Sequence, residues 1–138
     1  MLFPKKVKFR KWQKKRTKME GRVETRGIDI SFGSFGLKAE TMGRITSNQI
    51  EAARKAASRH LGKTGRMWIR IFPDRPFTTK AAEQPMGKGK GDLSGYHVEV
   101  LPGRVIFEVD GVDEVTAREA LRKAGTKLPI KTRSVARA

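Results

Sequence analysis

Cysteine is absent from the 138-residue chain. The sequence can therefore form no disulfide, no cysteine–zinc site and no thiolate nucleophile. Long apolar runs are missing as well, since none approaches the roughly 18 residues that a helix needs to span a bilayer. The N-terminus also lacks the apolar stretch of a secretory signal. We therefore expect a cytoplasmic protein with no membrane partner.

Acidic residues are scarce relative to basic ones. The chain carries 31 lysines and arginines against 14 aspartates and glutamates, which gives a formal net charge of +17 at pH 7. A charge of this size attracts polyanions, either nucleic acid or an anionic membrane surface. The length suits one domain, and the apolar fraction of 37% is sufficient for one core.

The first 22 residues concentrate the charge, with ten basic residues and a single acid, Glu20. We expect a basic N-terminal arm at residues 1–22, followed by one α+β RNA-binding domain at residues 23–138. One interpretation is a solvated arm, because blocks of like charge do not fold alone. The other is an arm that orders on RNA, with cations on phosphates and aromatic rings on bases. The candidate residues are Lys5, Lys6, Lys8, Phe9, Arg10, Lys11, Trp12, Lys14, Lys15 and Arg16.

Two helices are predicted in the domain. Thr46 and Gln49 form a capping box that begins the first helix, and Gly62 ends it. Asp113 is placed to cap a second helix that Gly125 ends. Apolar residues at helical spacing mark the inward faces, which are Ile50, Ala53, Ala57 and Leu61 in the first helix and Ala117, Ala120, Leu121 and Ala124 in the second.

Strands are predicted at residues 28–32, 66–72, 96–101 and 104–109, where residues alternate or form short apolar runs. Pro102-Gly103 indicates a hairpin between the last two. Pro129 assigns a final extended segment to a sheet edge, because proline donates no ladder hydrogen bond. Together these elements predict an α+β fold, with two helices packed on a mostly antiparallel sheet.

Residues 77–95 are predicted to form an extended loop. Its centre alternates glycine with lysine, as Met86, Gly87, Lys88, Gly89, Lys90 and Gly91. Glycine lets a backbone approach a phosphate closely, and the ammonium groups suit the same partner. A solvated surface loop is the alternative, because a glycine-rich stretch is a weak signal by itself.

Catalytic and metal sites find no support in the sequence. Residues 57–64 end in Gly62-Lys63-Thr64 and resemble a phosphate loop. They lie at the C-terminal end of a predicted helix, whereas a phosphate loop needs the free amides of a helix N-terminus. His60 and His97 lie in different elements and lack the further ligands that a metal requires. We expect no catalytic residue, no metal and no cofactor.

Several longer motifs follow one another along nearly the whole chain. They are Pro4-Lys5-Lys6, Ser31-Phe32-Gly33-Ser34-Phe35-Gly36-Leu37-Lys38-Ala39, Gln49-Ile50-Glu51-Ala52-Ala53-Arg54, Trp68-Ile69-Arg70-Ile71-Phe72-Pro73-Asp74-Arg75-Pro76, the Met86–Gly91 stretch, Pro102-Gly103-Arg104-Val105 and Lys127-Leu128-Pro129-Ile130-Lys131-Thr132. In this order they resemble the bacterial large-subunit ribosomal protein sixteen family. The chain departs from that family at Pro85, where many members carry arginine.

The resemblance implies a hammerhead-like body that is a structural constituent of the large ribosomal subunit. It implies binding to 23S ribosomal RNA, a role in late subunit assembly, and a loop that helps to position A-site tRNA near the peptidyl-transferase centre. P-site tRNA is a second candidate, and neighbouring large-subunit ribosomal proteins are further partners. No homo-oligomer is expected. A free-standing nucleic-acid-binding regulator is the alternative function.

RNA-binding candidates beyond the arm and the loop come from the helix, the strands and the C-terminal segment. They are Lys38, Arg54, Lys55, Arg59, Arg70, Arg75, Lys127, Lys131 and Arg133.

Overall fold

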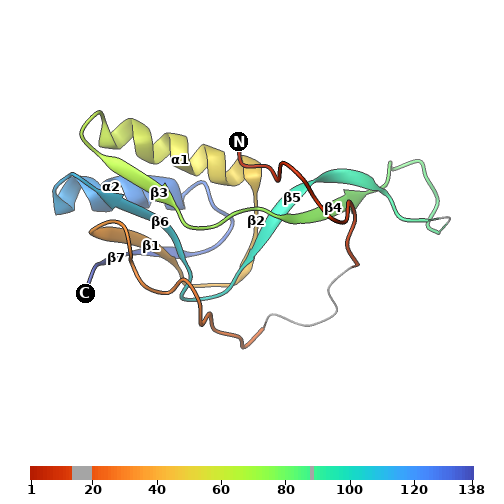
Figure 1. Cartoon of the computed structure of the whole chain (residues 1–138), viewed down its shortest axis with the longest axis horizontal. Coiled ribbons are helices and arrows are strands. Elements are labelled where there is room, and N and C mark those ends of the chain that lie inside the picture. The colour runs from red at the N-terminus through yellow and green to blue at the C-terminus, as the bar shows by residue number, and fades with distance from the viewer. Residues whose placement is uncertain (14–19, 88) are drawn as a thin grey trace.

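The described part of the chain forms a layered body with a long two-stranded extension at one end (Figure 1). The computed structural model describes residues 1–13, 20–87 and 89–138. In chain order its elements are β1 (Phe35–Ala39), β2 (Gly43–Thr46), α1 (Ser47–Leu61), β3 (Arg66–Ile69), β4 (Arg75–Thr79), β5 (Asp92–Val100), β6 (Val105–Asp110), α2 (Glu114–Gly125) and β7 (Thr132–Ala136). One antiparallel sheet has the order β3-β6-β1-β7, and the other has the order β2-β5-β4. The predicted α+β class is confirmed.

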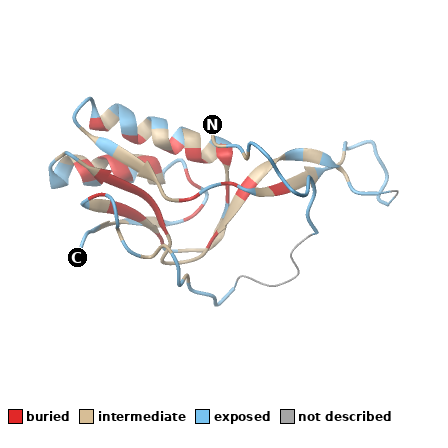
Figure 2. Ribbon diagram, viewed as in Figure 1, coloured by how far each residue is buried: buried red, intermediate tan, exposed pale blue. Residues whose placement is uncertain are grey.

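The two helices lie side by side over one face of the four-stranded sheet (Figure 1). Their inward faces are the predicted ones, and those residues are buried against apolar residues of the sheet such as Leu37 and Phe107 (Figure 2). Over the described residues, neither helix has the length and apolar character needed to cross a membrane. The core therefore belongs to the body, and the extension carries little of it.

Both helices begin and end close to the predicted residues. In the capping box of α1, the Thr46 side chain accepts from the Gln49 N–H (3.4 Å) and the Gln49 side chain accepts from the Thr46 N–H (2.9 Å). Gly62 ends α1 with a φ of +72°, a value that glycine adopts without strain. Asp113 occupies the N-cap position of α2 but makes no side-chain hydrogen bond there.

The predicted strand at residues 28–32 is wrong, because the sheet begins at Phe35. The alternation does describe packing, since Ile28 and Ile30 are half-buried, with Ile30 against Gly36 of β1 and Ile28 near Gly103. The amides of Ser31 and Phe32 donate to the carboxylate of Glu108 at 2.6 and 2.9 Å. Donors used in this way are not available for a β-ladder.

The predicted hairpin through Pro102-Gly103 is also wrong. The turn exists, since the Arg104 N–H donates to the Leu101 carbonyl (3.2 Å). However, β5 pairs with β2 and β4, whereas β6 pairs with β1 and β3. Gly103 instead donates to the Ala39 carbonyl (2.8 Å), which moves the chain from one sheet to the other.

The predicted loop at residues 77–95 is shorter than expected, because residues 80–91 connect β4 to β5 and the flanking residues are paired strands. Pro76 is compatible with β4 because β4 is an edge strand of its sheet. We call the β4–β5 pair the ribbon. Of the remaining strands, β1, β2 and β4 are missing from the prediction, and β3 ends three residues early at Ile69. The last strand, β7, lies at a sheet edge as expected, but it begins at Thr132 and so leaves Pro129, the reason for that prediction, outside the strand.

Candidate RNA-binding surface

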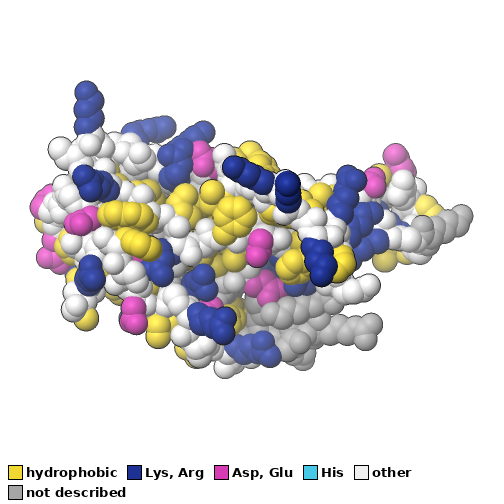
Figure 3. Space-filling model, viewed as in Figure 1, with side chains coloured by type: hydrophobic (Ala, Val, Ile, Leu, Met, Phe, Trp, Pro, Cys, Tyr) yellow, Lys and Arg dark blue, Asp and Glu magenta, His cyan; other side chains and the backbone are white. Residues whose placement is uncertain are grey.

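Lysine and arginine serve different purposes in the fold. Every ion pair within the described residues is made by an arginine, and the described lysines make none. Glu114 and Glu119 on α2, for example, pair with Arg118 (2.8 Å) and Arg122 (2.7 Å). Six of the fourteen acids, all of them glutamates, are thus paired with arginines, while the ammonium groups of the described lysines remain available to an external polyanion. Dark blue side chains are spread over the face seen in Figure 3.

The described part of the N-terminal arm runs beside the ribbon (Figure 1). The guanidinium of Arg75 lies 5.4 Å from the centroid of the Trp12 ring and donates to the Gln13 carbonyl at 3.1 Å. Lys90 donates to the Trp12 carbonyl, and the Phe3 ring packs edge-on against Tyr96 (6.4 Å). The structure thus brings together three predicted candidates from distant parts of the sequence, which are Trp12, Arg75 and Lys90.

The remaining arm candidates are exposed. Lys5, Lys6, Lys8, Phe9, Arg10 and Lys11 all lie on the surface, and Phe9 is 61% exposed. Lys8 lies over the Phe9 ring at 5.4 Å. Lys14, Lys15 and Arg16 lie outside the described residues, as does Lys88 of the loop.

The loop candidates lie at the far end of the ribbon, away from the helices (Figure 1). Met86 is 94% exposed, and Gly87, Gly89 and Lys90 are exposed too. Gly87 and Gly89 have φ values of +94° and +101°. Residues other than glycine rarely adopt these positive φ values. An added Cβ at either glycine would meet no atom within 4 Å. Glycine here therefore serves the backbone conformation and leaves room for a close neighbour.

The candidates on α1 are not equivalent. Arg54 is bound to Glu51 by two hydrogen bonds (2.5 and 3.1 Å), and this pairing raises the pKa of Arg54 and lowers that of Glu51. Lys55 and Arg59 are exposed on the same helix and make no ion pair within the described residues, although the charge of Lys55 helps to lower the pKa of Glu51. Their i, i+4 spacing sets two like charges side by side, an arrangement that a bound phosphate would relieve.

A second like-charge contact occurs at the sheet edge. Lys38 of β1 lies directly opposite Arg133 of β7 in the antiparallel register. Like charges directly opposite each other on two strands destabilise the sheet when no anion is bound between them. Lys127 and Lys131 are exposed nearby in the sequence. The edge is therefore a second cationic surface, on elements other than the ribbon.

Arg70 differs from the other candidates because its side chain is only 19% exposed and is bound to the buried Glu108 at 2.5 Å. It also lies over the Phe32 ring at 5.2 Å, and Phe32 stacks on Trp68 (6.1 Å). Its guanidinium holds the fold together, so we rank it last among the RNA contacts.

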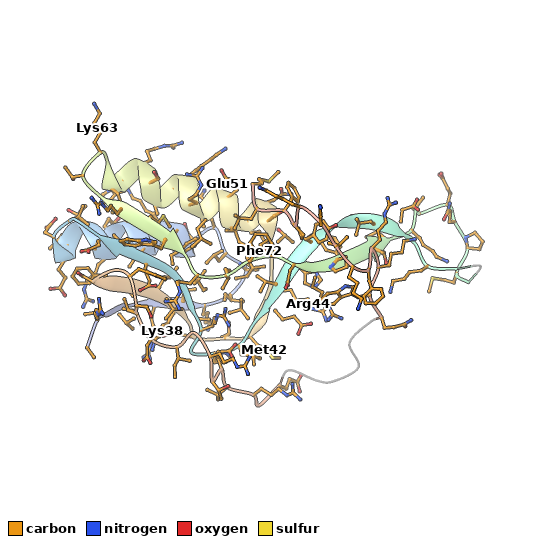
Figure 4. All side chains as sticks on the ribbon, viewed as in Figure 1. Lys38, Met42, Arg44, Glu51, Lys63 and Phe72 are labelled. Atoms are coloured by element: carbon orange, nitrogen blue, oxygen red, sulfur yellow. The ribbon has the colours of Figure 1, made fainter. Side chains whose placement is uncertain are left out.

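Sequence reasoning missed four residues at the arm–ribbon junction, which are Arg44, Phe77, Lys80 and His97. The alternation of polar Arg44, buried Ile45 and polar Thr46 is the signal for β2. Figure 4 shows Arg44 beside the ribbon. Phe77-Thr78-Thr79 is an aromatic and β-branched run, which is typical of a strand.

His97 is a buried polar residue of the junction, with only 6% of its surface exposed. Burial lowers its pKa, and the positive charges of Arg44 and Arg75 lower the pKa further. Its imidazole is therefore neutral at pH 7. A neutral imidazole donates from one ring nitrogen and accepts at the other.

This lowered pKa predicts a pH-dependent stability. The contribution of His97 to the free energy of unfolding is complete above the ordinary histidine pKa of 6.5. It declines as the pH falls below that value, because His97 takes up a proton in the unfolded chain before it does so in the folded one. We expect the urea unfolding free energy to drop between pH 7.5 and 5.5, and H97Q to flatten this drop. The matched control H60Q should keep it. An equal drop in wild type and H97Q would contradict the prediction.

Residues 57–64, which resemble a phosphate loop in sequence, lie as expected at the C-terminal end of α1. The Gly62 N–H is already bonded to the Ser58 carbonyl (3.2 Å), and Lys63 extends away from the helix end (Figure 4). Searching the described residues reveals no group of three or more His, Asp or Glu side chains able to hold a metal.

Comparison with known proteins places this surface in context. A family model described as ribosomal protein L16p/L10e matches residues 4–135. The chain is 54% identical over 137 residues to the large ribosomal subunit protein uL16 of Acidovorax sp. (strain JS42) and to that of Acidovorax ebreus (strain TPSY), covering 99% of this chain and 97% of each relative. It is 53% identical over 137 residues to the same protein of Halorhodospira halophila (strain DSM 244 / SL1), covering 99% and 98%.

Proposed function

Because this chain belongs to the ribosomal protein L16p/L10e family, a non-enzymatic family of the large ribosomal subunit, we propose that it binds 23S ribosomal RNA through the arm, the ribbon and the sheet edge. We further propose that the residue 80–91 loop helps to position A-site tRNA near the peptidyl-transferase centre, and that the chain acts in late subunit assembly. Family membership decides against the free-standing regulator.

One observation carries the proposal, which is that no described lysine makes an ion pair within the described residues, because the ion pairs there are all made by arginines. RNA phosphates are the natural partners of such groups, and displacement of condensed counterions favours binding. The lysines occur on the arm, on α1, at the sheet edge and in the loop. A polyanion that contacts all of them must extend over the body, as folded RNA does.

The shape of the molecule supports separate roles for the body and for the loop at the end of the ribbon. The body has the core and the sheet edge, whereas the ribbon holds the loop away from both (Figures 1 and 2). In this arrangement the body anchors the chain on ribosomal RNA, and the loop reaches a second partner. The glycine conformations at Gly87 and Gly89 suit close approach to a nucleic-acid backbone.

The proposal predicts a steep salt dependence. Each lost phosphate contact should reduce the slope of log affinity against log salt by about 0.7–0.9. We expect the arm variant K6A/K8A to lower the slope for a 23S ribosomal RNA fragment by about twice that amount. The control R118A/R122A removes the same charge from glutamate-paired arginines on α2, and it should change the slope little. An affinity that ignores salt would contradict the proposal.

Sedimentation of cell extracts tests the location. The chain should travel with large subunits through a sucrose gradient at low and moderate salt. Recovery only in the unbound fractions at the top of the gradient would instead favour the free-standing regulator.

A further inference from the structure

A pocket of about 440 Å³ lies between the arm and the ribbon. Its walls include Trp12 from the arm, Arg44 from β2, Arg75 and Phe77 from β4, Lys80 and Lys90 from the connecting loop, and His97 from β5. Pockets of this volume accept small molecules or single residues of a polymer. The lining therefore combines two kinds of group, cations and aromatic rings.

The cations exceed the acidic charge at the pocket. Glu99 lies 3.6 Å from Arg44 and 3.7 Å from Arg75, so one carboxylate is shared between two guanidinium groups. Within the described residues, Lys80 and Lys90 donate to backbone carbonyls alone, those of Gly87 and Trp12. A carbonyl carries no full charge, and a phosphate would be a stronger acceptor for both ammonium groups.

The aromatic groups are arranged for stacking. Arg75 covers one face of the Trp12 ring at 5.4 Å, yet Trp12 remains 40% exposed. Phe77 stacks on His97 with centroids 5.2 Å apart and an angle of 27°. An exposed ring backed by a guanidinium is a platform on which an unpaired base can stack.

His97 adds an unmet hydrogen bond. Its Nε2 atom is buried and has no partner within the described residues. A buried polar atom without a partner is costly to the fold.

We propose that this pocket receives one unpaired nucleotide of RNA, with its base on Trp12 and its phosphate on Lys80 and Lys90. The inference rests on the proposed RNA-binding function and refines it. Helical RNA keeps its bases paired and stacked, so only a bulged or looped-out nucleotide can enter. An acidic peptide would use the lysines but would leave the aromatic platform without a matching group.

The test compares two short RNA hairpins that differ only in the presence of one base. One carries a single bulged adenosine, and the other carries an abasic residue at the same position, so their phosphates are equal in number. The full chain carries W68F, which leaves Trp12 as its only tryptophan. We expect the bulged adenosine to bind about tenfold more tightly, since stacking of one base has that order of effect, and to quench Trp12 fluorescence.

Three variants separate the pocket from general charge. W12L should abolish the preference, so that the bulged-adenosine and the abasic hairpin bind with the same affinity. K80A/K90A should weaken both hairpins and lower the salt slope. K55A, on α1 and outside the pocket, should weaken both hairpins by one common factor and keep the tenfold preference.

The outcomes distinguish the two proposals. Equal affinity for both hairpins without quenching overturns the pocket inference but leaves RNA binding intact. Equal quenching by adenosine monophosphate alone, at the same concentration, assigns the pocket to a free nucleotide and also overturns it. Failure to bind either hairpin at low salt contradicts the proposed function itself.

Discussion

Replacement of Glu108 by alanine is expected to lower the unfolding free energy by roughly 3–5 kcal/mol, because it removes one partner of a buried ion pair. The side chain of Glu108 is fully buried and Arg70 reaches it at 2.5 Å. Urea unfolding of the full chain, followed by circular dichroism, measures the change. The control E114A removes a carboxylate from an exposed pair on α2, and it should cost far less.

The size of the effect comes from the number of donors that Glu108 satisfies. Its carboxylate accepts from Arg70 and from the backbone amides of Ser31 (2.6 Å), Phe32 (2.9 Å) and Gly33 (3.4 Å). Without the carboxylate, all of these donors lose their hydrogen-bond acceptor at once. An added Cβ on Gly33 would meet the Val109 carbonyl oxygen at 2.6 Å, so the segment lies too close to β6 to readjust freely.

A second variant separates charge from shape. E108Q keeps the acceptor oxygen but leaves the Arg70 charge uncompensated, so it should destabilise the fold less than E108A. The double variant E108L/R70L should recover part of the loss, since it removes both buried charges together. A loss of under 1 kcal/mol in E108A would contradict this account.

The same carboxylate predicts sensitivity to acid. Burial by itself would raise the pKa of Glu108, but Arg70 and the three amides outweigh it and lower the pKa below its ordinary value of 4.5. Its stabilising contribution is therefore complete above pH 4.5 and is lost as the pH falls through the lowered pKa. E108Q, which cannot titrate, should lack this component of acid unfolding.

The contrast between helices and strands explains which parts of the fold could be predicted. The capping box of α1 joins Thr46 to Gln49 within one turn, so the sequence displays it locally. Ser31 and Glu108 are 77 residues apart, and no window around Ile28–Phe32 reveals that its amides are used by a distant carboxylate. The hairpin error at Pro102-Gly103 has the same origin, because the partner of that turn is Ala39.

The candidate site divides in a similar way. Charge is a sum over residues, so the basic arm and the lysine loop are visible in the sequence. A side chain's internal partner is not visible in the sequence: Arg70 and Lys90 are both cations, yet one is bound to a buried glutamate and the other donates to a backbone carbonyl of the arm. The pocket was hidden for the same reason, since it exists only where the arm, β2 and the ribbon meet.

The double variant K88A/K90A is expected to weaken A-site tRNA binding to purified ribosomes by about tenfold. Two ammonium–phosphate contacts, each worth up to about 1 kcal/mol, amount to a factor of that order. The fold should be preserved, because Lys90 is exposed and, among the described residues, its side chain donates to the Trp12 carbonyl alone. Subunits from cells that carry the variant should also show immature large-subunit precursors on sucrose gradients.

Two controls assign this loss to charge at the loop. R118A/R122A removes the same net charge from the exposed surface of α2, and should leave tRNA binding and subunit maturation normal. K88R/K90R keeps the charge, so it should retain most of the binding. Because the loop lies at the end of the ribbon, away from the core, a stability effect cannot mimic the loss. Normal tRNA binding together with normal maturation in K88A/K90A would show that the loop's lysines do not contact the partner proposed for them.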